Sequence, residues 1–236
     1  MKKTLLSLSV LGLLSSACAF STPVTNVKIN GNIKPPTCVI NGMGNEADIE
    51  FKFSPINPAM LTKTTDFYTF PGIRNTLSVV CDATTYLIFT MTDVYPISDY
   101  VDKFGSTAYR VRNYGLVDPV TGKEVGGIVF VGQNLTVDGQ KVFMGQTAGT
   151  NARGVPRGYF VKDRVSTWTT IDKYPVNSIN DLDFMPGQTF GMDISTVNGL
   201  GYTYLKPTQV LAADGVNVND GFNFIGQAIM TFKFGI

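Results

Sequence analysis

The chain has 236 residues, of which 44% are hydrophobic and 16% charged, and its 19 Lys and Arg nearly balance its 18 Asp and Glu. No basic stripe is present, which argues against a nucleic-acid partner. The complete absence of histidine excludes Ser–His and Cys–His nucleophile systems and removes the commonest zinc ligand. We therefore expect no catalytic residue, no metal and no cofactor, and hence no enzymatic activity.

Residues 1–19 have the pattern of an export signal. Two lysines precede the apolar run Leu5–Leu14, and a small–x–small cleavage site follows at Ala17–Ala19. Cleavage there removes both lysines and leaves 17 basic against 18 acidic residues, a net charge of −1. A second interpretation makes Cys18 a lipidated cysteine. No later segment is long and apolar enough to predict a membrane helix.

Alternating apolar and polar residues predict strands close to the two remaining cysteines. Val27–Ile33 precedes Cys38, and Leu77–Cys81 ends on the second cysteine; both segments have the period of a half-buried strand. Ile49–Phe53 alternates in the same way. An even number of cysteines in an exported chain implies a disulfide, and the alternative of two free buried thiols does not suit an oxidising compartment. Closing a loop of about 43 residues stabilises a fold by about 4 kcal/mol.

The rest of the chain predicts an all-β fold of short strands separated by turns. Tyr86–Met91 is a continuous apolar run that we expect to be buried on both faces. Asp138–Gly139 between two apolar segments predicts a hairpin with a primed turn. Further strands are expected at Ala108–Arg112, Gly127–Val131, Tyr159–Val161, Trp168–Ile171, Phe190–Ile194, Tyr204–Leu205 and Gln209–Leu211. Loops are expected at Thr147–Pro156, Asn177–Gly187 and Asn217–Gly221, and no helix longer than two turns is predicted.

Two groups of side chains could bind a ligand, but each has a simpler interpretation. Asp181 and Asp183 could hold calcium, yet the spaced oxygen ligands and central glycine of a calcium loop are missing, which favours a solvated loop. Aromatic side chains could form a sugar-stacking patch, although in a β-sandwich they more often fill the core. These aromatic residues are Trp168, Tyr86, Tyr100, Tyr109, Tyr114, Tyr159, Tyr174, Tyr202 and Tyr204.

The last segment has the clearest strand pattern of the chain. One face carries the apolar residues Ala228, Met230, Phe232, Phe234 and Ile236, and the other carries Ile229, Thr231, Lys233 and Gly235. We interpret this segment as the final core strand. Its apolar face has to be covered by protein, because an exposed row of that size invites edge-to-edge aggregation.

Taken together, these features resemble subunits that are assembled by the bacterial chaperone–usher pathway. The resemblance rests on V-K-I-N-G-N-I at Val27–Ile33 with Cys38 seven residues after Gly31, and on L-S-V-V-C ending at Cys81. It also rests on the extension ahead of the first strand and on the alternating final strand. The middle of the chain, N-Y-G-L-V at Asn113–Val117 followed by G-K-E-V-G-G-I-V-F, is most similar to a less-studied family of fimbrial-like proteins encoded in enterobacterial fimbrial operons.

The resemblance implies an immunoglobulin-like pilin sandwich that lacks its last strand and carries enlarged loops. It implies a signal peptide at 1–19, an N-terminal extension at 20–28 and a sandwich domain at 29–236. The chain would be a structural or minor fimbrial (pilus) subunit serving cell adhesion, exported through the periplasm to the fimbrium at the cell surface. Its partners would be a periplasmic chaperone, an outer-membrane usher, neighbouring fimbrial subunits and, at the surface, a host or surface glycan.

In this family, a strand supplied by the chaperone, and then by the extension of the next subunit, replaces the missing strand in a process of donor-strand exchange. The resemblance therefore implies that Phe20–Lys28 is a donor with Val24 as its apolar peg, and that the final strand is part of the acceptor. The implied residues for binding the chaperone or a subunit are Val24, Met230, Phe232, Phe234 and Ile236. The alternative hypothesis is a self-sufficient secreted or periplasmic carbohydrate-binding β-sandwich.

Overall fold

The computed structural model describes residues 34–64, 67–96, 110–148, 151–172, 182–197 and 203–234. The chain divides into two units between Lys34 and Pro35, and every described helix and strand belongs to the second unit, residues 35–236. The predicted strand at Val27–Ile33, the signal and the N-terminal extension lie outside the described residues. The domain boundaries drawn from the sequence therefore stay predictions.

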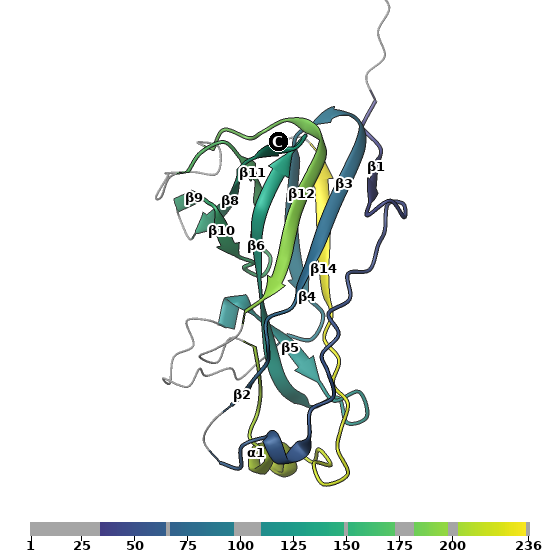
Figure 1. Ribbon diagram of the computed structural model, residues 1–236, viewed down its shortest axis with the longest axis vertical. Helices are drawn as coiled ribbons and strands as arrows, with labels where there is room; N and C mark the ends of the chain where they lie inside the picture. Colours follow the sequence, from purple (N-terminus) through teal and green to yellow (C-terminus); the bar gives the residue numbers. More distant parts are fainter. Residues whose placement is uncertain are drawn as a thin grey trace, which may run out of the picture. The chain divides into compact units, whose positions relative to one another are not determined.

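Two antiparallel sheets form a β-sandwich, which confirms the predicted all-β fold (Figure 1). The larger sheet has the order β1 (Cys38–Ile40), β3 (Arg74–Thr85), β12 (Gly187–Thr196), β6 (Glu124–Val137), β13 (Tyr204–Leu205) and β2 (Tyr68–Thr69). β5 (Asn113–Val117), β7 (Gln140–Lys141) and β10 (Arg157–Tyr159) also pair with β6. The five-stranded sheet has the order β14 (Ala228–Phe234), β4 (Leu87–Asp93), β11 (Ser166–Thr169), β8 (Phe143–Ala148) and β9 (Asn151–Val155).

Apolar side chains from facing strands build the core between the sheets. Trp168 of β11 is fully buried, and its ring centroid lies 5.3 Å from those of Phe89 in β4 and Phe190 in β12. The indole N–H of Trp168 donates to the carbonyl of Gly191 at 3.0 Å, so its polar atom is satisfied inside the core. The rings of Trp168 and Phe190 therefore join the two sheets at the centre of the sandwich.

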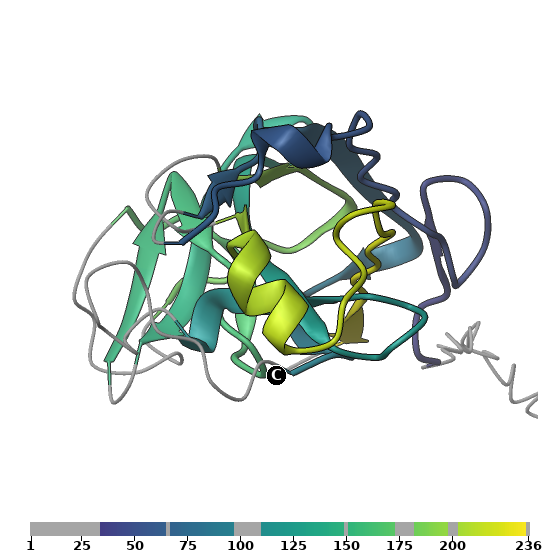
Figure 2. The same ribbon diagram turned by 90° about the horizontal axis from the view of Figure 1, so that it is seen from below.

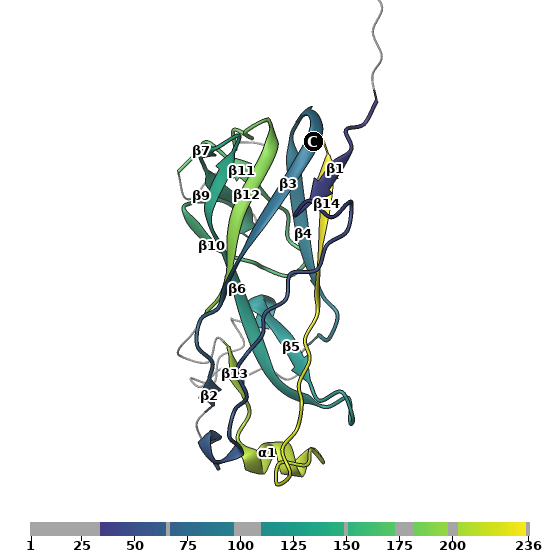
Figure 3. The same ribbon diagram turned by 45° about the vertical axis from the view of Figure 1, so that its right-hand side comes forward.

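The long strand β6 continues past the sandwich and is covered there by β5 and β13 (Figure 3). The short helix α1 (Thr208–Ala213) and a 3-10 turn at Pro58–Met60 lie together at this end of the unit (Figure 2). The backbone N–H groups of Thr208 and Gln209 donate to carbonyls that follow the 3-10 turn, at 2.9 and 3.2 Å. The strand predicted at Gln209–Leu211 is therefore wrong, because Pro207 fixes the start of a helix that buries Leu211.

Several other predictions differ from the structure in type or position. Arg110–Arg112 form a 3-10 turn rather than the end of a strand, and the preceding predicted residues lie outside the described ranges. β10 and β11 each begin two residues before the strands expected at Tyr159–Val161 and Trp168–Ile171. The predicted loop at Thr147–Pro156 instead contains the end of β8 and the whole of β9, which pair as a hairpin. The glycine and small polar residues of this segment lack the apolar alternation by which strands are predicted from sequence.

The apolar run at Tyr86–Met91 is not buried on both faces as expected. Leu87, Phe89 and Met91 of β4 are buried, but Ile88 is half-buried and Tyr86 is 41% exposed. The strand belongs to a sheet that packs on one face only, so its outward side chains reach the surface even where they are apolar.

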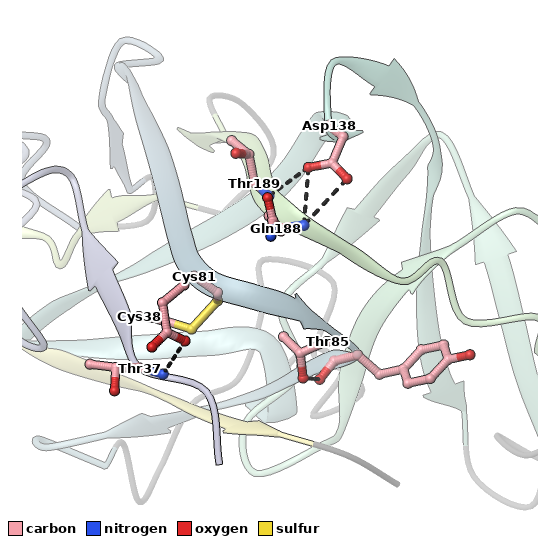
Figure 4. Close-up of a disulfide and its surroundings, with 9 residues drawn as sticks. Thr37, Cys38, Cys81, Thr85, Asp138, Gln188 and Thr189 are labelled. Carbon is pink, nitrogen blue, oxygen red and sulfur yellow. Dashed lines mark hydrogen bonds between the residues drawn. A yellow bond between two sulfur atoms is a disulfide. The ribbon is translucent and has the colours of Figure 1, made fainter. Parts of the chain in front are cut away.

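The predicted hairpin at Asp138–Gly139 is confirmed. Both residues have positive φ, 49° and 78°, as a type I′ turn requires, and the flanking residues pair across β6 and β7. The Asp138 carboxylate also accepts the backbone N–H groups of Gln188 and Thr189 at 3.0 and 2.7 Å (Figure 4). The turn thus fixes the start of β12 as well as the end of β6.

Cys38 and Cys81 form the predicted disulfide and face each other directly across β1 and β3 (Figure 4). Beside the bond, the backbone N–H of Thr37 donates to the Asp82 carboxylate at 2.8 Å. β1 has three residues only, so the covalent link supplies much of what holds this short edge strand to the sheet.

A buried ion pair joins the end of β4 to the segment that follows β10. The Asp93 carboxylate accepts from Lys162 Nζ at 2.8 Å and from the backbone N–H groups of Gly115 and Tyr95, each at 3.1 Å. The side chains of Asp93 and Lys162 are 2% and 14% exposed. Lys162 Nζ also lies 5.7 Å from the ring centroid of Tyr114. A charge at this depth is tolerated because it is paired and hydrogen-bonded.

We expect the double variant Cys38→Ser, Cys81→Ser to lose about 4 kcal/mol of unfolding free energy, because the unfolded chain regains the entropy of the open loop. Urea unfolding followed by circular dichroism measures the loss, and reduction of the unaltered protein serves as the control because it should reproduce it. A loss below about 1 kcal/mol in both samples would contradict this account.

Lys162→Met should cost about 3 kcal/mol, since it leaves the buried Asp93 carboxylate without its cation. The matched control is Lys52→Met, which removes an exposed pair with Glu50 at 3.0 Å and should cost less than about 1 kcal/mol. Both values come from urea unfolding under one set of conditions. Equal losses in the two variants would show that the ion pair does not hold this junction.

Candidate functional site: an apolar groove

A groove of about 910 Å³ lies along one side of the sandwich and is lined by β14 and by residues 45–53. Figures 1 and 3 both show these two segments side by side. Core strands from both sheets supply the floor. The buried floor residues are Leu77, Met91, Tyr114, Leu116, Ile128, Phe130 and Ile194. The groove therefore has an apolar floor that belongs to the buried core.

Residues 45–53 form the first wall. Ile49, Phe51 and Phe53 are half-buried and pack on the core, and the charged residues between them are exposed. The ring centroid of Phe51 lies 5.2 Å from that of Phe130 in the floor. The alternation predicted for Ile49–Phe53 is therefore found, but the predicted strand is not, because this extended segment has no partner in a ladder.

The backbone of this wall is free for pairing. Among the described residues, 45–53 make no backbone–backbone hydrogen bond, and the Asn75 side chain donates to the Glu50 carbonyl at 2.9 Å. Just before the wall, Asn41 and Ser78 exchange bonds that extend β1, and a turn at Gly42 redirects the chain. The wall is thus an extended segment anchored at its start and unpaired along its length.

β14 forms the second wall and is the terminal strand of its sheet. It pairs with β4 along its full length, from Ala228 opposite Asp93 to Phe234 opposite Leu87, and within the described ranges nothing pairs with its other edge. Ala228, Met230 and Phe232 are half-buried and pack on the core. The final strand predicted from the sequence is confirmed over Ala228–Phe234, whereas its last two residues lie outside the described ranges.

Aromatic rings pack around Phe53 in the lining of the groove. Phe53 lies 4.5 Å from Phe70 and 6.3 Å from Phe224, measured between ring centroids. Ile40 and Phe232 also line the groove. An extended peptide rises about 3.3 Å per residue, so the wall at 46–53 matches a strand of about eight residues, or about 26 Å.

The polar groups of the groove lie at its rim and at one point of its floor. Glu46, Asp48 and Glu50 are exposed residues along the first wall. In the floor, Tyr114 is 1% exposed, and its hydroxyl has no hydrogen-bond partner in the described part of the chain. Burial, reinforced by the Asp93 and Asp163 carboxylates, raises the pKa of Tyr114 far above its ordinary value, so the phenol stays protonated.

The structure places the site residues expected from the sequence in three ways. Met230 and Phe232 line the groove. Phe234 belongs to the same strand but is 42% exposed and does not line it. Val24 and Ile236 lie outside the described residues. The sequence reasoning missed the wall at 45–53 as part of the site, although the alternation in Ile49–Phe53 was a usable signal.

The structure does not support the two other ligand sites considered from the sequence, an aromatic sugar-stacking patch and a calcium site. Trp168, Tyr114 and Tyr204 are buried and Tyr159 is half-buried, so these rings serve the interior rather than a stacking surface. The remaining predicted rings, apart from the exposed Tyr86, lie outside the described ranges. In the described part of the chain, no group of three or more acidic or cysteine residues could hold a metal ion. The backbone carbonyl of Asp183 accepts from Thr169 and Thr170, and Asp181 is not described.

No known family model and no curated protein matches the chain, so its function has to be inferred from the groove itself. Over the described ranges, no helix has the length and hydrophobicity to cross a membrane.

Tyr114→Phe should leave the unfolding free energy unchanged or raise it by up to about 1 kcal/mol, because the variant removes a buried hydroxyl that has no partner among the described residues. Tyr114→Ala should cost about 3 to 5 kcal/mol, since it also empties the floor of the groove. Urea unfolding of both variants tests this. A loss above about 1 kcal/mol in the Phe variant would reveal a partner for the hydroxyl.

Proposed function

We propose that the groove accepts an extended strand from another polypeptide, and that the protein is a structural or minor fimbrial subunit assembled by donor-strand exchange. The observation that carries the proposal is that both segments lining the groove, β14 along one edge and residues 45–53, have unpaired backbone groups above a buried apolar floor. In strand addition, main-chain hydrogen bonds supply affinity and alternate side chains supply register. Both requirements are met by this groove.

The apolar face of β14 supports the same proposal. On this face Phe234 is 42% exposed, and Met230 and Phe232 are half-buried. An unprotected apolar edge of this kind promotes aggregation unless another chain covers it. A periplasmic chaperone would cover it first, and a neighbouring subunit would replace the chaperone at an outer-membrane usher. In this interpretation the sandwich is immunoglobulin-like and lacks one strand.

The Cys38–Cys81 disulfide is consistent with an exported protein, as the proposal requires. The final location at the fimbrium, the role in adhesion and a glycan receptor belong to the same proposal. In the assembled fibre, the extension at Phe20–Lys28, with Val24 as its peg, would fill the groove of the next subunit. This role needs no catalytic residue, metal or cofactor.

The proposal is tested by appending to the same chain an extra strand that can occupy the groove. A short linker followed by a nine-residue strand of alternating Val and Thr is appended after Ile236, because β14 ends at the same end of the sandwich as β1, close to the groove that both strands help to line (Figure 3). Burying several valines should raise the melting temperature of the periplasmic protein by about 10 °C and yield a soluble monomer without a chaperone.

The matched control carries Asp in place of each inward-facing Val of the appended strand, and it should behave like the parent chain. The melting temperature comes from circular dichroism, and the oligomeric state comes from size exclusion with light scattering. A parent chain that is already a soluble monomer, and gains nothing from the appended strand, would refute the strand-accepting groove.

A further inference from the structure

The exposed rim of the groove is acidic, and we infer that the strand it accepts belongs to a different protein and carries Lys or Arg on its outward face. This inference rests on the proposed function and names the partner of the same groove.

The alternation of the first wall separates its apolar and charged side chains. Ile49 and Phe51 point toward the core, whereas Glu46, Asp48 and Glu50 are exposed. In an antiparallel or parallel sheet, neighbouring side chains on one face lie about 5 Å apart. A strand placed between the walls would therefore bury every second side chain and set the others beside this row of carboxylates.

Two of these carboxylates make no ion pair within the described part of the chain. Glu50 pairs with Lys52 at 3.0 Å, but Glu46 and Asp48 make no ion pair with any described residue. On the second wall, the outward residues are Ile229, Thr231 and Lys233. Lys233 comes after Phe232, the last residue of β14 that lines the groove. The uncompensated negative charge thus lies along the first wall, next to the outward face of an inserted strand.

The chain's own extension does not supply the matching charge. With Val24 facing inward, the outward residues of Phe20–Lys28 are Ser21, Pro23, Thr25 and Val27, none of which is charged. At exposed sites, a like-charge or uncharged side chain opposite a carboxylate lowers the affinity of the inserted strand only modestly. Among strands with the same inward apolar residues, however, this difference decides which strand binds more tightly. The groove is therefore better suited to a basic strand of another protein than to the extension of a second copy.

Four fluorescent nine-residue peptides test this inference on the full chain, residues 20–236, diluted from urea with its disulfide intact. Three share inward Val residues and carry outward Lys, Thr or Glu, and the fourth is the sequence of residues 20–28. By fluorescence anisotropy at low salt, the Lys peptide should bind about five-fold more tightly than the Thr peptide and the Glu peptide about five-fold more weakly. These differences should fall below about two-fold in 0.5 M NaCl.

Substitutions of the rim residues test whether their charges cause the preference for the Lys peptide. The double variant Glu46→Gln, Asp48→Asn should abolish the preference for Lys, and Lys233→Gln should increase it. Asp172→Asn, an exposed carboxylate that does not line the groove, is the matched control and should leave the preference unchanged.

The outcomes separate this inference from the proposed function. Equal binding of the Lys and Glu peptides, or a preference that survives in the double variant, would overturn the charge selection while leaving strand addition intact. Tighter binding of the 20–28 peptide than of the Lys peptide would overturn the assignment to a different protein. Failure of all four peptides to bind would refute the strand-accepting groove itself.

Discussion

Every β-strand carries backbone groups on two edges, and a fold is stable only where these groups are paired with protein or exposed to water. In this protein, two segments with unpaired backbone groups line a groove whose floor consists of buried apolar side chains. A single extended segment could pair with these backbone groups and also pack on the floor, which is why we propose a strand rather than a small molecule as the ligand of the groove.

The position of the first wall depends on a few strong local links. The disulfide holds β1 to β3, and the bonds between Asn41 and Ser78 extend that pairing by one residue. Beyond this point, packing of Phe51 on Phe130 replaces the backbone ladder. The second wall depends on β4, whose end is fixed by the buried ion pair of Asp93 and Lys162. The two walls are thus anchored independently, each by one interaction that is hard to replace.

The sequence predicted the features that depend on local pattern. The alternation in Ala228–Phe234, the positive φ demanded by Asp138–Gly139 and the pairing of Cys38 with Cys81 all appear in the structure. Features that depend on a distant partner were predicted poorly. Ile49–Phe53 alternates like a strand but has no neighbour to pair with, and the expected strand at Gln209–Leu211 is a helix because of the preceding proline and one buried leucine.

The groove itself could not be predicted from residue patterns, since its two walls lie far apart in the sequence and are brought together only by the fold. The first wall, residues 45–53, lacks backbone pairing, and this affects how a strand would bind. Segments with exposed apolar contacts and no ladder have low local stability against opening. An inserted strand would add a row of main-chain bonds to residues 45–53, so binding and ordering of this wall become coupled. Ordering of residues 45–53 would then reduce the net binding free energy of every inserted strand by a similar amount. The small differences in pairing with the rim charges would therefore determine which strand is preferred.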